Sequence, residues 1–474
     1  MPASRLPPTA PANRSAPTAH PSATSQGGLS HGMKPRQLVM MGLGTAIGAG
    51  LFLGSGIGVR AAGPAVLVSY LVAGLLVIIV MRALGEMAAA KPSSGAFSVY
   101  AADAMGKTAG ATVGWLWWAQ VVIVIAAESV GAAGLLATVW PALPVATMSL
   151  VFMVVFTVIN LMGVKNFGEF EFWFAILKVA AIIAFLIVGA LLLLGLLPNV
   201  PSPGLSNFTA HGGFAPKGLA GIGAALLVVI FAFGGTEIVA VAAAETRDPE
   251  RSISQAIRTV VWRIMVFYIG SLSVIVAVVP WTSESLASPF AAVLQAANIP
   301  GAATAITLVA VIALLSALNA NLYGASRMIF SLAERGEAPR VLSRLNHRQV
   351  PVIAVLSCVA FGFFATLLES WYPNKVLPVL LNLVGSTCLL VWTIALVSQL
   401  ILRRRADRRG TPLPFRMWAF PYMTWLGLAI LVAIFALTLL DKGSRVQFLS
   451  TLTLTLAIAA VIELARRWRA RRAG

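Results

Sequence analysis

Long apolar runs separated by short polar or basic segments follow one another along most of the chain. Each run has about 20 residues, which is the length a helix needs to cross the hydrocarbon core of a bilayer. A transmembrane β-barrel is excluded, because its strands would alternate polar and apolar residues in units of about ten. The pattern predicts an all-α polytopic membrane protein with twelve transmembrane helices, at residues 37–58, 64–89, 113–138, 143–163, 171–197, 220–243, 260–280, 301–333, 353–370, 376–402, 417–440 and 446–465.

The composition excludes a soluble domain. Of 474 residues, 59% are hydrophobic and 11% are charged, whereas soluble proteins carry about 25% charged residues. Residues 1–34 are rich in Pro, Ser, Ala and Thr, which predicts a disordered tail without the apolar segment of a signal peptide. We expect the transmembrane domain to cover residues 35–465 and a basic tail to cover 466–474.

The net charge of +18 would suggest a nucleic-acid ligand in a soluble protein. Here the basic residues lie in short segments between the apolar runs, where they set orientation by the positive-inside rule. This predicts a multi-pass plasma-membrane protein with both termini cytoplasmic and no nucleic-acid partner. The basic runs at 403–409 and 466–472 are interpreted as topology determinants, with anionic lipid binding as the alternative. The basic residues expected outside are Arg60, Lys217, Lys375, Lys442 and Arg445.

Two of the predicted helices are interrupted. Residues 42–50 contain four glycines, and residues 231–237 contain the pair Gly234-Gly235. Interruptions in corresponding helices of two halves are typical of a transporter's substrate site. The first and sixth runs would then each begin a five-helix repeat, with the last two runs outside the repeats. The alternative is close helix packing through small residues.

Unwound backbone can recognise a zwitterion without charged side chains. The N–H groups of Ile47–Gly50 would bind a carboxylate at the positive end of a half-helix, and carbonyls freed at the second interruption would accept hydrogen bonds from an ammonium group. The candidate substrate-binding residues are Ala46, Ile47, Gly48, Ala49, Gly50, Phe231, Ala232, Phe233, Gly234 and Thr236.

Glu128, Lys178 and Glu237 are ionisable residues well inside apolar runs. A charge at the bilayer centre costs at least about 2.5–3.5 kcal/mol, so such residues are functional candidates. We assign these three to proton coupling, because desolvation would allow Lys178 to load and release a proton. The alternatives are a snorkelling Lys178, a structural hydrogen bond at Glu128 and a packing acceptor at Glu237.

No pattern points to catalysis, a metal or a cofactor. Both cysteines lie in apolar runs, and the four histidines lie outside them. We therefore expect a protein that is not an enzyme. A channel or sensor is disfavoured because no filter loop or sizeable soluble domain is evident.

Several motifs in order resemble the bacterial amino acid permeases of the amino acid–polyamine–organocation superfamily. The resemblance implies a leucine-transporter-type fold, a 5+5 inverted repeat with helices 1 and 6 broken, and proton-coupled uptake. It further implies that Phe231 caps the substrate and that Lys178 replaces a sodium ion. The motifs are Ala46–Gly56, Ala62–Ala65, Arg82–Met87, Gly114–Trp118, Asn166–Trp173 and Ala325–Met328.

Within that family, Ala49 and the segment 231–246 are most similar to 4-aminobutyrate permeases. The predicted function is proton-coupled symport of a small neutral amino acid, with 4-aminobutyrate as the first choice. The expected partners are the amino acid, protons and the lipid bilayer, and the sequence predicts no oligomeric state. An exchanger, or a permease for proline, alanine, glycine or aromatic amino acids, remains an alternative.

Overall fold

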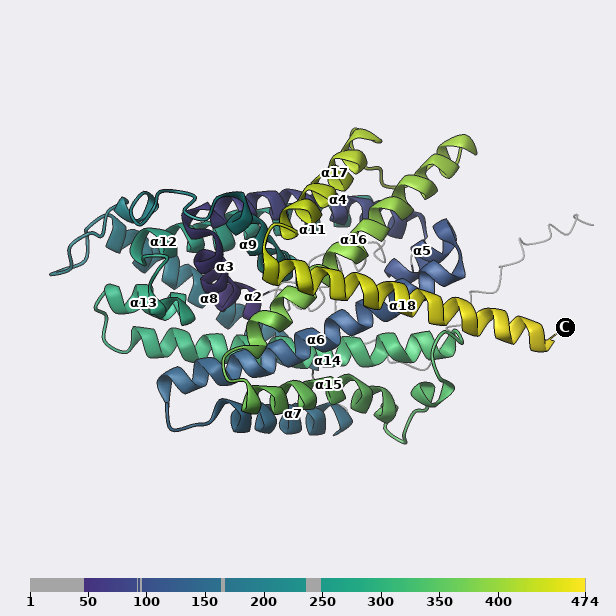
Figure 1. The fold of residues 1–474 in the computed structure, drawn as a ribbon, viewed down its shortest axis with the longest axis horizontal. Helices are drawn as coiled ribbons and strands as arrows, with labels where there is room; N and C mark the ends of the chain where they lie inside the picture. The colour runs from purple at the N-terminus through teal and green to yellow at the C-terminus, as the bar shows by residue number, and fades with distance from the viewer. Residues whose placement is uncertain (1–46, 92, 94–95, 163–166, 236–248, 474) are drawn as a thin grey trace, which may run out of the picture. The chain divides into compact units, whose positions relative to one another are not determined.

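The computed structural model describes residues 47–91, 93, 96–162, 167–235 and 249–473, and within these ranges it contains helices and turns but no strand (Figure 1). The predicted all-α class is therefore confirmed for this part of the chain. A described helix coincides with each predicted apolar run, and two short helices, α5 and α13, lie between runs.

The first part of the chain runs from the first interruption to the second. Its helices, with 3₁₀ turns marked η, are α2 (Ala49–Phe52), α3 (Gly54–Ala62), η1 (Gly63–Ala65), α4 (Val66–Ala90), α5 (Ala96–Met105), α6 (Lys107–Val139), α7 (Val145–Met162), α8 (Phe167–Leu193), η2 (Ser206–Phe208) and α9 (Gly218–Phe233).

The second part begins after the residues that follow α9. It contains the helices α11 (Pro249–Arg263), α12 (Gly270–Val278), α13 (Pro289–Ala296), α14 (Ala302–Glu334), α15 (Val352–Trp371), α16 (Val376–Arg408), α17 (Tyr422–Thr438) and α18 (Lys442–Ala473), the π-helix η3 (Ile264–Ile269) and the 3₁₀ turns η4 (Glu284–Ala287) and η5 (Arg340–Ser343).

Helix α6 lies at the centre of the packing. It contacts α14 most extensively, and it also packs on α5, α15 and α16. Figure 1 shows α6, α14, α15 and α7 side by side. The most apolar 18-residue window of α6 is 72% buried, whereas that of α7 is 17% buried. The outer face of α7 exposes side chains such as Val154, Val158 and Met162, as expected for a helix that faces lipid.

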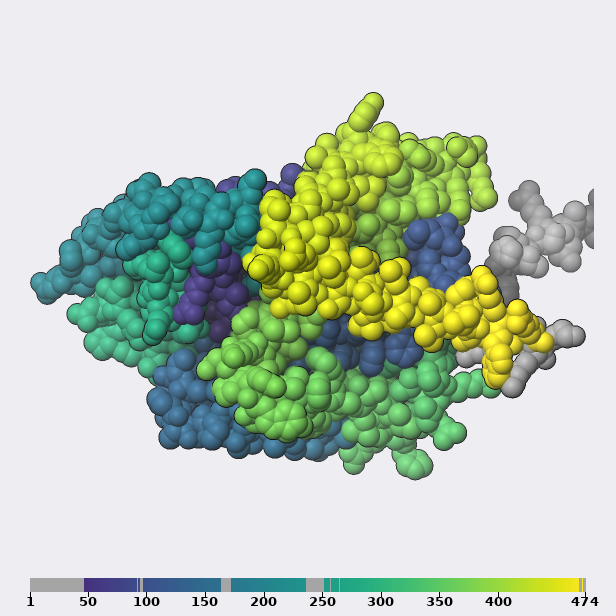
Figure 2. All heavy atoms as spheres, in the orientation of Figure 1, coloured from purple at the N-terminus to yellow at the C-terminus, as the bar shows by residue number. Residues whose placement is uncertain are grey.

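Helix α18 lies on the outside of the bundle. It packs on α6 and α16, and Figure 2 shows it in yellow, crossing the face of the molecule in view. The helix continues to Ala473, so the described part of the basic segment after residue 465 is helical.

Nine helices of the described ranges are long and apolar enough to cross a membrane, and two shorter apolar helices, α9 and α17, cover two further runs. The count differs from twelve because the segment Ala49–Ala90 joins the first two predicted runs. The chain turns there at Gly63, whose φ of 64° places it in the left-handed region. A Cβ at this glycine would lie 2.6 Å from Pro216 Cγ, so both conformation and space require glycine.

A buried carboxylate joins α4 to the end of α16. Glu86, which is 2% exposed, accepts hydrogen bonds from Arg403 at 2.7 Å, Gln399 at 2.8 Å and the Met417 backbone N–H at 2.6 Å. The Gln399 amide oxygen in turn accepts from the Thr424 hydroxyl of α17 at 2.8 Å. Because all of these groups are away from water, each depends on the others for hydrogen bonding.

Replacing Glu86 should therefore destabilise the protein far more than replacing a carboxylate in an exposed pair. The Glu86–Arg403 and Asp103–Lys91 ion pairs have the same N···O distance of 2.7 Å, but only the first is buried. We expect Glu86→Gln to lower the free energy of unfolding by about 3 kcal/mol, the low end for breaking a buried ion pair. The loss is limited because Asp407 still pairs with Arg403. Asp103→Asn should cost below about 1 kcal/mol. Thermal unfolding in detergent compares the two variants, and equal melting temperatures would contradict this account.

Candidate functional site

The described part of the first glycine-rich segment begins with Ile47 and Gly48, directly before α2. These two residues form a bend, and Gly48 has φ −146° and ψ −145°, outside helical values. The chain becomes helical at Ala49, so the first backbone N–H groups of α2 lack the usual acceptor four residues earlier. Ala46, the remaining candidate of this segment, lies outside the described residues.

The Glu128 carboxylate of α6 caps the start of α2. The Ala49 N–H donates to Glu128 Oε1 at 3.2 Å and to Oε2 at 3.0 Å. Glu128 is 2% exposed, and a negative charge is favourable at the N-terminus of a helix. The N–H of the next residue, Gly50, has no acceptor among the described residues. The break thus binds a carboxylate, and in this conformation the carboxylate belongs to the protein itself.

Two glycines allow this close approach. A Cβ at Gly48 would collide with Glu128 Oε1 and lie 3.2 Å from the Ala317 Cβ. A Cβ at Gly50 would lie 2.5 Å from the Ala232 Cα on α9. The small-residue packing considered from the sequence is therefore present, and it brings the backbones of the two interrupted helices into direct contact.

The second interruption ends α9. Its last helical residue is Phe233; Gly234 follows with φ −57° and ψ 139°, and Gly235 has φ +90°. The Ala232 carbonyl accepts a hydrogen bond from the Tyr268 hydroxyl at 3.0 Å. Phe231 is 6% exposed, which is a buried position for the side chain expected to cap a substrate. Thr236 and Glu237 lie outside the described residues.

Tyr268 is a site residue that the sequence analysis missed. It lies in the π-helix η3, and its ring packs against Phe233 and Tyr70 with centroid distances of 5.1 and 6.1 Å. Phe233 therefore belongs to a buried aromatic cluster. Tyr268 is also close enough to Glu128 and Arg263 for their charges to act on it. π-Helical turns are frequent at functional sites, but the sequence carries no periodic signal for one.

Lys178 is fully buried on α8, with 0% of the residue exposed. A lysine that snorkelled to the membrane surface would expose its ammonium group, so that alternative does not describe this structure. Lys178 and Glu128 are close enough for their charges to interact. The structure thus brings together two of the three ionisable residues singled out within the apolar runs.

Gln120 is a second residue that the sequence analysis missed. It lies on α6 eight positions before Glu128 and is 4% exposed. A Cβ at Gly234 would lie 3.8 Å from Gln120 Nε2, so the amide lies beside the second break. Its Oε1 has no hydrogen-bond partner among the described residues. Helix α6 therefore presents a carboxylate to one break and an amide to the other.

Comparison with known proteins places most of the chain in one group. The family model "Amino acid permease" matches residues 37–473. The aromatic amino acid transport protein AroP of Corynebacterium glutamicum is 48% identical over 90% of this chain and 93% of its own length. The γ-aminobutyric acid permease of Bacillus subtilis is 44% identical over 91% of this chain and 92% of its own length. The γ-aminobutyric acid permease of Escherichia coli is 40% identical over 93% of this chain and 95% of its own length.

The contact between Gly48 and Glu128 predicts a large effect from a very small substitution. Gly48→Ala should displace the Glu128 carboxylate and destabilise the protein by about 1–3 kcal/mol, the usual cost of overpacking. Gly134→Ala on α6 is the matched control, because nothing lies within 4 Å of its Cβ position. Thermal unfolding should show a lower melting temperature for Gly48→Ala only.

A double-mutant cycle separates this contact from a general effect at Gly48. In a Glu128→Ala background the methyl group of Gly48→Ala meets no carboxylate, so the added loss of stability should be smaller. An equal loss in both backgrounds would show that the contact with Glu128 is not the cause.

Proposed function

The chain belongs to the amino acid permease family, as the order of its motifs predicted, and on this premise we propose that it is a proton-coupled symporter that imports a neutral amino acid. Family membership and the apolar helices make it an amino acid transport protein of the plasma membrane with several spans. The coupling ion, the substrate and the topology are the parts that we propose.

The proposed topology has twelve spans, both termini in the cytoplasm and ten core helices in two inverted repeats of five. The positions of Lys and Arg between the apolar runs support the orientation. The contact of Gly50 with Ala232 supports the repeat, because it joins the first helix of one proposed repeat to the first helix of the other. Broken helices that meet in this way are typical of transporter substrate sites.

The observation that carries the proposed mechanism is the buried Glu128 carboxylate, which accepts from the Ala49 N–H and lies within range of the charge of Lys178. We expect the substrate carboxylate to bind at the same helix terminus, at the N–H groups of Ile47–Gly50. When Lys178 is protonated, its positive charge offsets the negative charge of Glu128. The start of α2 can then also bind the substrate carboxylate. When Lys178 loses its proton, the two carboxylates repel each other.

Substrate and proton therefore favour each other's binding, and the effect is reciprocal. Release of the proton on the cytoplasmic side weakens substrate binding there, so both leave together. Glu237 would be a further carboxylate that takes part in proton coupling. Phe231 would cover the bound substrate, and Thr236 and the carbonyls after Phe233 would bind its ammonium group.

The charge pattern favours a substrate without a charged side chain. Glu128 and Lys178 offset each other, and Gln120 offers an uncharged amide beside the second break. The Gln120 oxygen is an acceptor suited to an ammonium group set apart from the carboxylate, as in 4-aminobutyrate. A second candidate is an aromatic amino acid, since the relative from Corynebacterium glutamicum, at 48% identity, is named for that substrate class.

Replacing Lys178 tests the coupling. Lys178→Met removes the proposed proton carrier, so proteoliposomes with an inward proton gradient should no longer accumulate labelled substrate, whereas counterflow exchange should remain measurable. Lys375→Met, which removes an exposed lysine, should accumulate substrate like the unchanged protein, and replacing sodium by choline should have no effect. Accumulation by Lys178→Met at the unchanged level would rule out this residue as the coupling group.

Competition for uptake tests the substrate class. Unlabelled 4-aminobutyrate should inhibit uptake of its labelled form at least tenfold more potently than lysine or glutamate, because a further charge would lack a partner in the site. Gln120→Leu should raise the KM for 4-aminobutyrate. Stronger inhibition by tryptophan or phenylalanine would select the aromatic candidate, and stronger inhibition by lysine or arginine would contradict the charge argument.

A further inference from the structure

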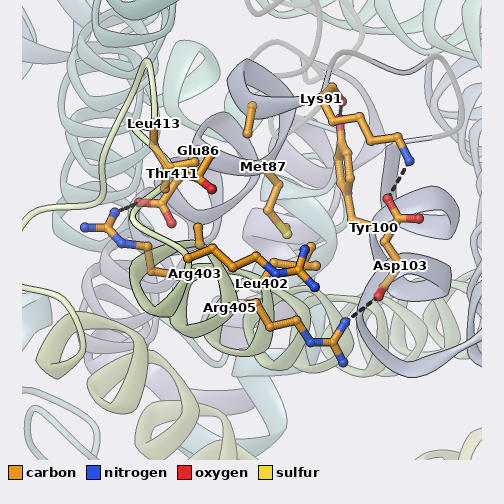
Figure 3. A pocket seen from close by; sticks show the side chains of 13 residues that line it. Glu86, Met87, Lys91, Tyr100, Asp103, Leu402, Arg403, Arg405, Thr411 and Leu413 are labelled. Carbon is orange, nitrogen blue, oxygen red and sulfur yellow. Dashed lines mark hydrogen bonds and ion pairs between the residues drawn. The ribbon is translucent and has the colours of Figure 1, made fainter.

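A cavity of about 350 Å³ lies where α4, α5 and α16 meet (Figure 3). Its polar lining comes from the C-terminal ends of α4 and α16 and from α5, and Thr411 and Leu413 of the following loop complete it. Both α4 and α16 belong to candidate membrane spans. The cavity therefore lies where these helices emerge from the apolar part of the bundle.

The lining carries an excess of positive charge. Four basic and two acidic residues contribute to it: Lys91, Arg403, Arg405, Arg409, Glu86 and Asp103. Both acidic residues are paired, Glu86 with Arg403 and Asp103 with Lys91, each at 2.7 Å. Asp407, which does not line the cavity, also pairs with Arg403.

The remaining two arginines have no carboxylate partner among the described residues. Arg405 donates to the backbone carbonyls of Asp103 at 2.8 Å and Ala104 at 2.9 Å, at the end of α5, and Figure 3 shows it reaching toward Asp103. Arg409 directly follows the last residue of α16, four positions after Arg405, and is exposed. A guanidinium group can bind a phosphate through two parallel hydrogen bonds.

Five of the other lining residues have wholly apolar side chains: Met87, Ala90, Leu402, Ala406 and Leu413. A free inorganic anion would gain nothing from these side chains, whereas the glycerol backbone and upper acyl chain of a phospholipid would cover them.

We propose that this cavity binds the phosphate group of an anionic phospholipid, with the headgroup between Arg405 and Arg409 and the start of an acyl chain against Met87 and Leu402. The site is separate from the proposed transport function and does not depend on it. Bound lipid would connect the ends of α4, α5 and α16, and a basic cavity at the end of a membrane helix suits anionic headgroups.

Native mass spectrometry of the detergent-purified full-length protein tests this proposal with phosphatidylglycerol as the probe. The unchanged protein should retain one phosphatidylglycerol more than Arg409→Gln and than Arg405→Gln/Arg409→Gln. Arg404→Gln/Arg408→Gln is the matched control, because it removes two exposed arginines of the same helix that do not line the cavity. If both double variants lose the same amount of lipid, lipid retention depends only on the number of positive charges, and the proposed site would be wrong.

A variant that keeps every arginine tests the cavity without disturbing the hydrogen bonds of Arg405. Ala406→Phe places a larger side chain in the cavity lining and should displace the same lipid without removing an arginine. Retention of the lipid by this variant would overturn the proposal.

Melting temperatures in detergent distinguish the source of the phosphate. Short-chain phosphatidylglycerol should raise the melting temperature of the unchanged protein but not that of Arg409→Gln. Inorganic phosphate and short-chain phosphatidylcholine at equal ionic strength should have no such effect. An equal rise with inorganic phosphate would contradict the lipid assignment.

Discussion

The hydrogen bonds from the Ala49 N–H to the Glu128 carboxylate are the interaction on which the rest of the site depends. A helix that begins inside an apolar bundle exposes N–H groups that water cannot reach, and each unsatisfied group costs several kcal/mol in such surroundings. Glu128 supplies the missing acceptor. A negative charge is favourable at the start of α2, and Lys178 is close enough for its charge to act on Glu128.

This requirement accounts for the positions of the neighbouring residues. Gly48 leaves room for the carboxylate, and Gly50 lets α2 lie directly on the backbone of α9. Tyr268 holds the last turn of α9 through the Ala232 carbonyl and packs against Tyr70 of α4. Helix α4 continues from that aromatic contact to Glu86, 16 residues or about 24 Å further along, where a second buried carboxylate fixes α16 through Arg403.

The sequence predicted the helices, and it predicted non-helical backbone at Gly48 and at Gly234–Gly235, because both are local properties. Apolar runs of membrane length indicate spans, and glycines at 42–50 and 234–235 weaken a helix wherever they occur. The sequence also selected Glu128 and Lys178, because a charge within an apolar run is rare. Residues 236–248, with Thr236 and Glu237, lie outside the described part of the chain, so their roles stay predictions.

What the sequence did not predict depends on contacts between distant segments. Glu128 and Ala49 are 79 positions apart, so their pairing is set by how α6 packs against the break. The π-helical turn that positions Tyr268 shifts the register of side chains without any change in composition, and Gln120 lies in an apolar run where one amide is not unusual. In the same way, α3 and α4 follow each other with only the turn at Gly63–Ala65 between them, and the contact of Gly63 with Pro216 that fixes this turn involves a distant segment.

In the proposed mechanism the Glu128 carboxylate and the substrate carboxylate share the start of α2, so binding of substrate should change the surroundings of Glu128. Infrared difference spectra of the reconstituted protein, recorded with and without saturating 4-aminobutyrate or, failing binding, phenylalanine, test it most directly. Substrate should shift a carboxyl band, and the absence of that band in Glu128→Gln identifies it as Glu128. Saturated binding of substrate with no change in any band of Glu128 would contradict the account.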